Sequence, residues 1–151
     1  MMIHVVIGEE DFSLTEHYEA VRGLGDCGAV VAFVGQVRDD DDLATTLTLE
    51  CYVPMAQQVL HNIAQQACVN FDLSAVRIVH RVGVLAQNAQ IVLVLVASGH
   101  RKSAFEAAQF IMDVLKTEAP FWKKISNAHG ERWVEAKDTD EQASKRWQYV
   151  L

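Results

Sequence analysis

The chain has 151 residues, of which 50% are hydrophobic and 22% are charged, a composition that excludes a largely disordered protein and predicts one globular domain over residues 1–151. Its net charge of −7 disfavours non-specific binding to nucleic acid or to anionic membranes. The longest apolar run, residues 91–97, is far shorter than the roughly 20 residues of a membrane-spanning helix, so we expect no such helix.

The N-terminal half of the chain contains three predicted strands and one short helix. Residues 2–7 are an apolar strand, and a Ser-x-x-Glu capping box starts a helix over about residues 13–22. Residues 29–37 are rich in valine and predict a strand covered on both faces, whereas residues 45–53 alternate like a half-buried strand. The four aspartates at 39–42 repel one another and are expected to form an exposed loop.

The C-terminal half contains two longer segments with helical spacing of apolar residues. One is expected over about residues 55–70, and the other starts with a capping box at Ser103 and ends before Pro120. Strands are predicted at 76–82 and 91–97, followed by a hairpin around 127–130. This order indicates an α+β domain in which two main helices pack on a mixed or antiparallel sheet.

The cysteines and histidines show neither a disulfide framework nor a metal-binding pattern. Cys27, Cys51 and Cys68 are odd in number and widely spaced, without a Cys-x-x-Cys motif, which is typical of the reducing cytoplasm. The six histidines are scattered, so we expect no metal. The sequence also lacks the glycine-rich motifs of dinucleotide-binding and P-loop proteins, and we expect no cofactor.

Three cationic residues follow the most apolar predicted strand. His100, Arg101 and Lys102 lie where that strand leads into the second main helix, so their side chains and the free N–H groups of the helix start converge. This arrangement favours a phosphate or a carboxylate ligand. The alternative is that they are solvated loop residues beside a helix cap.

A second group of cations surrounds Pro120. Lys116 lies near the predicted helix end and Lys123 follows two aromatic residues, so a sharp turn can project both lysines into one cleft. A lysine beside other cations, shielded from water by aromatic walls, can act as an acid or base near neutral pH. The alternatives are that Lys116 only complements the helix dipole and that Lys123 lies on a surface strand.

Arg38 ends the valine-rich strand and is a third candidate for binding an anion. An arginine at a strand end can make bidentate contacts with a phosphate. A surface ion pair with the aspartates at 39–42 is the alternative.

Six segments carry the most recognisable motifs of the chain. The segment Lys-Thr-Glu-Ala-Pro-Phe-Trp-Lys-Lys, at 116–124, is the most specific of them. The other segments are 28–38, 47–52, 80–83, 98–101 and 104–107. In this order they resemble the large, catalytic subunit of molybdopterin synthase, and the resemblance extends from about residue 12 to residue 147.

The resemblance implies an α/β-hammerhead type of α+β fold and a sulfurtransferase activity in molybdenum cofactor biosynthesis. In this family, cyclic pyranopterin monophosphate receives two sulfurs and becomes the dithiolene of molybdopterin. The sulfur arrives as a thiocarboxylate on the Gly-Gly C-terminus of a small subunit with a ubiquitin-like fold. A homodimer of large subunits carries one small subunit at each end, which gives a heterotetramer.

The resemblance also implies roles for individual residues. Lys116 and Lys123 are the expected catalytic lysines, which transfer protons and stabilise the charge of a tail-linked intermediate. Lys137 falls where a basic residue of the family reaches across the dimer, although a lysine lacks the bidentate fork of an arginine. The expected pterin and phosphate ligands are Arg38, His100 and Arg101, and the residues expected to shape the pocket are Gln36, Val37, Lys124 and Ile125.

Two other functions are compatible with parts of the sequence. A non-catalytic relative of the same fold would bind the pterin phosphate and the partner without turnover, but the presence of both Lys116 and Lys123 argues against it. A phosphate-ester hydrolase would fit the cationic cluster, but the chain shows no metal-ligand pattern and no nucleophile for that reaction.

Overall fold

The computed structural model describes residues 2–38, 45–134, 142–143 and 145–147. The predicted α+β class is confirmed, because strands and helices follow one another without a regular β-α-β alternation. The elements are β1 (Met2–Gly8), α1 (Leu14–Val21), β2 (Ala29–Gln36), β3 (Thr46–Glu50), α2 (Val53–Phe71), β4 (Leu73–Arg81), β5 (Gly83–Leu85), β6 (Gln90–Ser98), α3 (Arg101–Glu118), β7 (Trp122–Asn127) and β8 (Gly130–Val134).

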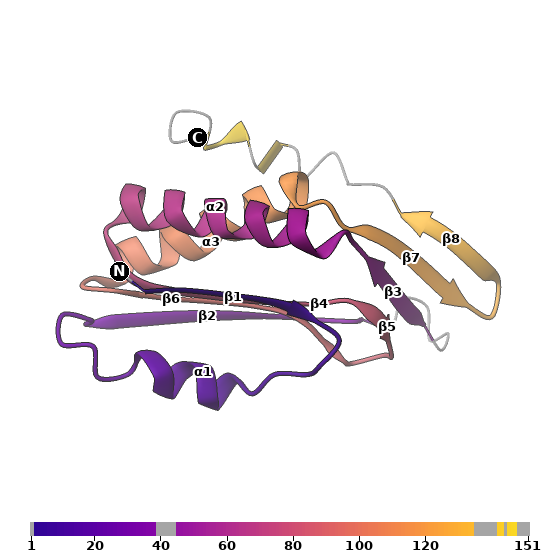
Figure 1. Cartoon of the computed structure of the whole chain (residues 1–151), viewed down its shortest axis with the longest axis horizontal. Helices are drawn as coiled ribbons and strands as arrows, with labels where there is room; N and C mark the ends of the chain where they lie inside the picture. Colours follow the sequence, from indigo (N-terminus) through magenta and orange to yellow (C-terminus); the bar gives the residue numbers. More distant parts are fainter. Residues whose placement is uncertain (1, 39–44, 135–141, 144, 148–151) are drawn as a thin grey trace.

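Four strands form a central mixed sheet in the order β1-β4-β6-β2 (Figure 1). β1 is parallel to β4, and the other two pairs are antiparallel. Helices α2 and α3 cover one face of this sheet, as predicted for the two main helices, and the shorter α1 lies on the other face (Figure 1). None of the helices formed by the described residues is long and apolar enough to cross a bilayer.

The main core lies between the central sheet and the pair α2 and α3. The apolar residues of α2 recur at steps of three and four, so that Leu60, Ile63, Ala64 and Ala67 all face the sheet and are buried. Phe110 of α3 is fully buried among them. This packing fixes α2 and α3 relative to the strands. The C-terminal end of α3 is therefore fixed as well.

Trp147 fixes the C-terminal part of the described chain to this core. Its indole packs edge-on against Phe71 and Phe110, with ring centroids 5.7 and 5.6 Å apart. Its Nε1–H donates a hydrogen bond of 2.8 Å to Oδ2 of Asp113, and the other carboxylate oxygen accepts a bond of 2.6 Å from Gln109. The buried carboxylate therefore has a partner for each oxygen.

The second sheet has the order β5-β3-β7-β8 and is antiparallel throughout. It extends beyond the end of the central sheet at which β2 finishes (Figure 1). Leu47 and Leu49 of β3 pack with Val37 and Leu85 in a small core of their own, and Ile125 of β7 packs against it. The chain enters β7 directly after α3, so the helix end and this sheet meet.

Some predicted boundaries differ from those in the structure. Ser13 caps α1 as predicted and accepts a backbone N–H at 3.3 Å. However, α3 begins at Arg101, before the predicted Ser103, and its N-cap residue His100 makes no side-chain cap bond. The three-residue β5 was not predicted, and the acidic run at 39–42 lies outside the described residues.

Candidate active site

Lys116 and Lys123 lie on either side of a tight turn between α3 and β7. Lys116 is exposed in the last turn of α3. The C-cap residue of this helix is Ala119, whose N–H donates to the carbonyl oxygen of Leu115 at 3.1 Å. The N–H of Phe121 then donates to the carbonyl oxygen of Ala119 at 2.9 Å, which closes the turn around Pro120. The predicted sharp turn between the two lysines is confirmed.

The register of β7 decides which way its lysines face. Lys123 is paired with Leu49 and Ile125 with Leu47, so these side chains share the face that carries the small core with Val37. Residues next to each other on a strand point to opposite faces, which places Lys124 on the other face of the sheet.

Contacts of Lys124 agree with that assignment. Its Nζ lies 3.6 Å from Oε2 of Glu131 and 5.6 Å from the ring centroid of Trp133, its cross-strand partner. Lys124 was expected to shape the same pocket as Lys123, but the structure separates the two side chains. Ile125, by contrast, lies on the face of Lys123 and is half-buried.

Phe121 forms the covered wall of the turn, because it stacks on His80 at the end of β4. The two ring centroids are 3.9 Å apart and the ring planes differ by 12°. The other predicted wall, Trp122, is 59% exposed and therefore shields little from water. His80 was not predicted as a site residue, although it begins the recognisable segment 80–83.

The imidazole of His80 is neutral at physiological pH. Burial lowers its pKa to about 4, the hydrogen bond to the backbone of Arg81 opposes that change, and the charge of Lys116 lowers the pKa further. The ammonium of Lys116 therefore lies within electrostatic range of the ring. Because the His80 ring is neutral, it places no second positive charge next to Lys116.

Acid is expected to destabilise the fold through His80. Because its pKa is about 4 in the folded chain and 6.5 when unperturbed, the unfolded chain binds more protons between these values. Stability is retained above the unfolded value and falls as the pH drops towards 4, by up to about 3 kcal/mol. Denaturant titrations at about pH 7 and about pH 4.5 should show a smaller loss of unfolding free energy for His80→Phe than for wild type. Equal losses would contradict this assignment.

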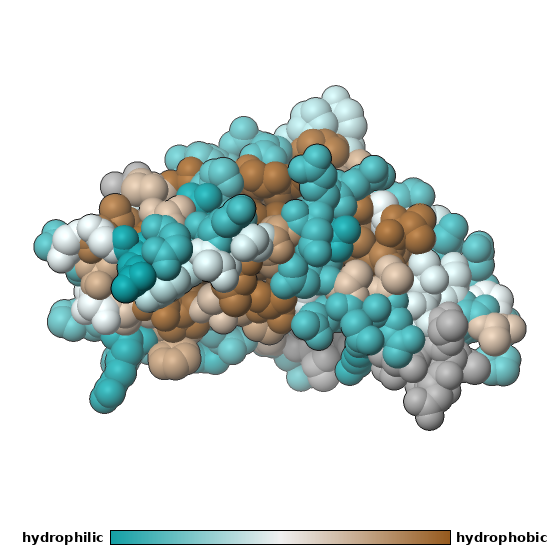
Figure 2. All heavy atoms as spheres, turned by 90° about the horizontal axis from the view of Figure 1, so that it is seen from below, coloured by the Kyte–Doolittle hydropathy of each residue, from teal (hydrophilic) through white to brown (hydrophobic). Residues whose placement is uncertain are grey.

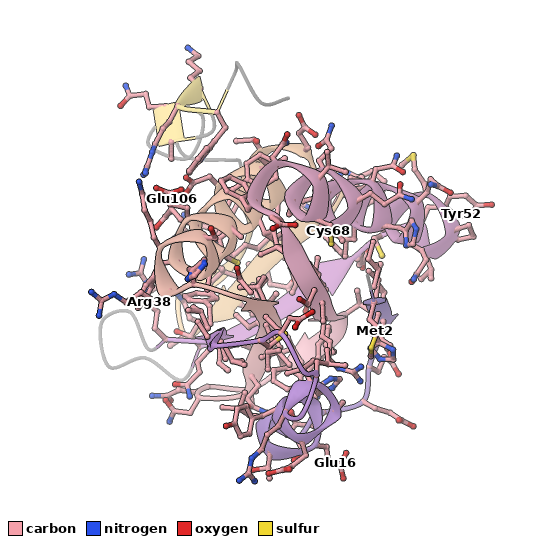
Figure 3. The ribbon with its side chains drawn as sticks, turned by 90° about the vertical axis from the view of Figure 1, so that its left-hand side faces the viewer. Met2, Glu16, Arg38, Tyr52, Cys68 and Glu106 are labelled. Carbon is pink, nitrogen blue, oxygen red and sulfur yellow. The ribbon has the colours of Figure 1, made fainter. Side chains whose placement is uncertain are left out.

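Arg38 belongs to the same end of the molecule as the lysines. Gln36 is paired with Gln90 at the start of β6, and His80 is paired with Val92 two residues further on. The exposed side chain of Arg38 follows directly after this strand end and points away from the body of the protein (Figure 3). Among its neighbours in the sequence, Gln36 is exposed and Val37 is buried in the small core.

His100 and Arg101 lie at the opposite end of the central sheet. Ala29 at the start of β2 is paired with Ser98 at the end of β6, whereas Arg38 follows the end of β2. Arg101 and Lys116 are separated along α3 by 15 residues, or about 22 Å at the rise of an α-helix. The structure therefore does not bring Arg38 and the pair His100 and Arg101 around one phosphate within a single chain.

The start of α3 retains the features of an anion site. The N-cap residue makes no side-chain cap bond, so the first N–H groups of the helix are available. His100 and Arg101 are exposed beside them. Gly28 packs against this loop so closely that a Cβ there would lie 2.6 Å from the backbone oxygen of Gly99, which requires glycine.

Lys137, expected to reach across a dimer, lies outside the described residues.

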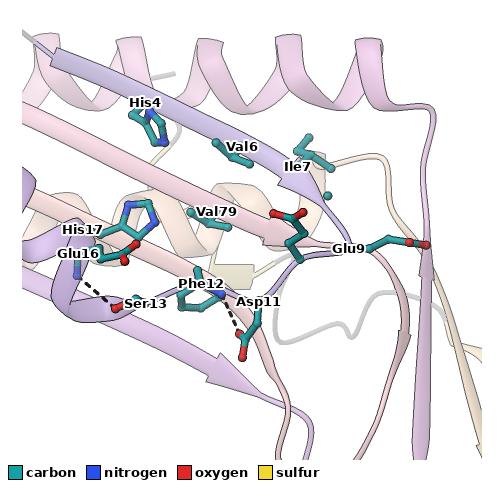
Figure 4. Close-up of a pocket in the computed structure, with 12 residues that line it drawn as sticks. His4, Val6, Ile7, Glu9, Asp11, Phe12, Ser13, Glu16, His17 and Val79 are labelled. Carbon is teal, nitrogen blue, oxygen red and sulfur yellow. Dashed lines mark hydrogen bonds between the residues drawn. The ribbon is translucent and has the colours of Figure 1, made fainter.

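A cavity of about 600 Å³ opens near β1 and α1, on the opposite face of the central sheet from α3 (Figure 4). Its lining includes Glu9, Glu10, Asp11 and Glu16 and none of the predicted site residues. These carboxylates would repel an anionic ligand, the class of ligand expected from the cationic residues. Figure 2 shows this side of the protein, where apolar surface lies among polar residues. Val6, which lines the cavity, is 41% exposed (Figure 4). The cavity is therefore not the candidate active site.

Cys51 and Cys68 are not activated as nucleophiles. Burial raises the pKa of the Cys68 thiol to about 11 and also raises the pKa of Cys51, so both are protonated at neutral pH. The three cysteines are free of disulfides. Among the described residues, no group of three or more histidine, cysteine, aspartate or glutamate side chains could hold a metal ion.

Comparison with known proteins identifies the family. Residues 7–118 match the family described as MoaE protein. The chain belongs to the MoaE family. The molybdopterin synthase catalytic subunit of Escherichia coli (strain K12) is 46% identical over 145 residues, which cover 95% of this chain and 97% of the relative.

Solved structures share the fold of this MoaE chain. The molybdopterin biosynthesis MoaE protein from Burkholderia ambifaria MC40-6 is 44% identical, with a TM-score of 0.82, and the match covers 97% of this chain and 98% of that one. The complex of subunits 1 and 2 of molybdopterin-converting factor from Helicobacter pylori 26695 contains a chain with a TM-score of 0.71 at 21% identity, covering 90% of each. The fold expected from the sequence resemblance is thus confirmed.

Proposed function

We propose that this chain is the catalytic subunit of a molybdopterin synthase. Membership of the MoaE family, together with relatives named as that subunit, assigns the chain to molybdenum cofactor biosynthesis as a sulfur-transferring enzyme. The proposed reaction transfers sulfur from the thiocarboxylated C-terminus of a small ubiquitin-like subunit to cyclic pyranopterin monophosphate. The observation that carries this proposal for the chain itself is the pair of lysines held on either side of one tight turn.

The two lysines suit the charges of this reaction. The thiocarboxylate tail and the pterin phosphate are both anions, and the net charge of −7 would repel them elsewhere on the surface. Lys116 and Lys123 provide positive charge and exchangeable protons at the turn, and Arg38 lies at the same end of the molecule. We assign proton transfer and stabilisation of the tail-linked intermediate to the lysines, and phosphate binding to Arg38.

The position of His100 and Arg101 supports a homodimer with a shared active site. They are too far from Lys116 within one chain to contact the same small ligand. A second copy related by a two-fold axis can bring its own helix start towards the lysine turn of the first. In this arrangement each pterin phosphate contacts Arg38 and the lysines of one copy and His100 and Arg101 of the other. With the small subunits bound, the assembly is a heterotetramer.

The decisive experiment combines the purified chain with a thiocarboxylated small subunit and cyclic pyranopterin monophosphate. Formation of the dithiolene product, detected by mass spectrometry, is expected. A small subunit with an ordinary carboxylate at its C-terminus is the matched control, because it can bind but carries no sulfur. Binding of both ligands without product would favour the non-catalytic relative of the same fold.

Sulfur transfer is expected to survive replacement of all three cysteines. Cys51 and Cys68 are protonated at neutral pH, and the proposed sulfur donor is the partner's tail. We therefore expect Cys27→Ser, Cys51→Ser and Cys68→Ala together to retain activity within about tenfold, the loss arising from packing around Cys68. A folded variant without activity would instead indicate a persulfide on this chain. Free thiols suit the reducing cytoplasm, in which we place the reaction.

A further inference from the structure

His80 joins the central sheet to the turn that carries both lysines. It is 6% exposed, lies at the end of β4 and stacks face to face on Phe121, with ring centroids 3.9 Å apart. Phe121 and Pro120 lie between the α3 cap residue Ala119 and β7, so the ring of Phe121 is held in the short segment that connects Lys116 to Lys123. Through this stack, the turn contacts the end of β4 in the central sheet.

The end of β4 is a firm support for that stack. The guanidinium of Arg81, the next residue, donates hydrogen bonds to the backbone oxygens of Glu9, at 2.9 and 3.2 Å, and of Gln90, at 2.9 Å. These bonds tie the end of β4 to the segment after β1 and to the start of β6. The ring of His80 is therefore carried by a strand end that is braced on both sides.

The orientation of the imidazole is also fixed. Its Nδ1 lies 2.9 Å from the backbone oxygen of Arg81. A carbonyl oxygen can only accept, so in the neutral ring Nδ1 carries the proton and Nε2 does not. The neutral ring therefore has one tautomer, and its plane lies within 12° of the plane of the Phe121 ring.

We propose that His80 is a positioning residue: its buried ring, stacked on Phe121, fixes the turn that sets Lys116 and Lys123 relative to each other, a role that rests on the proposed function of the two lysines. The stack holds the chain between the lysines against the sheet. Without it, the turn keeps its backbone bonds but loses its support from β4. A displacement of about 1 Å in reacting groups can cost about 100-fold in rate.

Two substitutions of His80 separate the ring from its hydrogen bond. His80→Asn keeps an N–H donor for the oxygen of Arg81 but has no ring, whereas His80→Phe keeps a ring for Phe121 but has no donor. We expect His80→Asn to lower kcat by about 10- to 100-fold with KM values within about twofold of wild type. His80→Phe is expected to restore kcat to within about fivefold of wild type.

The matched control is Val79→Ala. Val79 is 5% exposed and precedes His80 on β4, but it packs on the other face of the sheet, towards α1. This variant loses core packing without touching Phe121, so it is expected to keep the kcat of wild type while its thermal midpoint falls. A loss of kcat in Val79→Ala equal to that in His80→Asn would show that general destabilisation is the cause and would overturn the proposal.

A second measurement does not depend on sulfur transfer. Limited acylation with acetic anhydride, followed by peptide mass spectrometry, compares Lys123 with Lys102, an exposed lysine at the far end of α3. Loosening of the turn should expose the half-buried Lys123, so in His80→Asn its acylation relative to Lys102 should rise by about threefold or more. Unchanged acylation together with unchanged kcat would overturn the proposal, as would a His80→Phe variant as defective as His80→Asn.

If His80→Asn does not fold, Phe121→Leu and Phe121→Tyr test the same stack from its other side. Leucine removes the stack and should show the loss of kcat and the rise in Lys123 acylation, whereas tyrosine keeps it and should not. Equal behaviour of the two variants would overturn the proposal. Acylation of Lys123 could rise only in the variants that lack the stack, while even the wild-type chain forms no dithiolene. In that case the proposed function fails, but the role of His80 in holding the turn stands.

Discussion

Lys116→Ala is expected to slow dithiolene formation by about 10²- to 10⁴-fold, the usual cost of removing a positioned acid or base. Lys116 is exposed at the end of α3, so the change removes no core packing. Its favourable interaction with the helix dipole contributes only about 0.3–1 kcal/mol to stability. Single-turnover product formation measures the effect, and circular dichroism with a thermal scan checks that the fold is intact.

Adjacent lysines of β7 provide the matched comparison. Lys123→Ala should be impaired to a similar degree as Lys116→Ala, because Lys123 faces the small core side of the second sheet next to the turn. Lys124→Ala should stay within about fivefold of wild type, because its side chain lies on the opposite face, with Glu131 and Trp133. Wild-type rates in a folded Lys116→Ala chain, or equal losses at Lys123 and Lys124, would contradict these roles.

Local sequence signals predicted most of the elements and the turn between the lysines. Pro120 cannot continue a helix, so the chain had to turn between Lys116 and Lys123, as it does. Helix starts were less certain, since two capping-box patterns looked alike. Ser13 caps α1, but α3 begins at Arg101, three residues after β6 ends at Ser98 and before the predicted start at Ser103. The extent of the domain over residues 1–151 stays a prediction.

The arrangement of the residues expected to bind anions could not be predicted, because it depends on strand order and direction. β2 and β6 are antiparallel, so the end of one lies beside the start of the other, and Arg38 is separated from His100. His80 was missed because its local pattern, between Val79 and Arg81 near the end of a predicted strand, carries no signal of a contact with Phe121, which lies 41 residues further along the chain. The side of Lys124 could have been found, since neighbours on a strand alternate.

A heterodimer of two inactive variants is expected to recover about half of the wild-type activity. One chain carries Lys116→Ala, and the other carries His100→Ala and Arg101→Ala. Each variant alone as a homodimer has two defective sites, because every site lacks either the lysine or the helix-start cations. In the heterodimer of a two-fold symmetric pair, one site combines the intact lysine of one copy with the intact His100 and Arg101 of the other, and the second site lacks both.

Coexpression with two different affinity tags and sequential purification isolates the heterodimer, and dithiolene formation per dimer is then compared with wild type. The distance of about 22 Å along α3 between Arg101 and Lys116 makes the outcome decisive. If both groups served one site within a single chain, each site of the heterodimer would be defective, and its rate would equal the mean of the two inactive homodimers. Failure of the two tags to copurify would contradict the homodimer itself. Recovery of about half the activity would require that the lysines of one copy and the helix start of the other act on the same substrate.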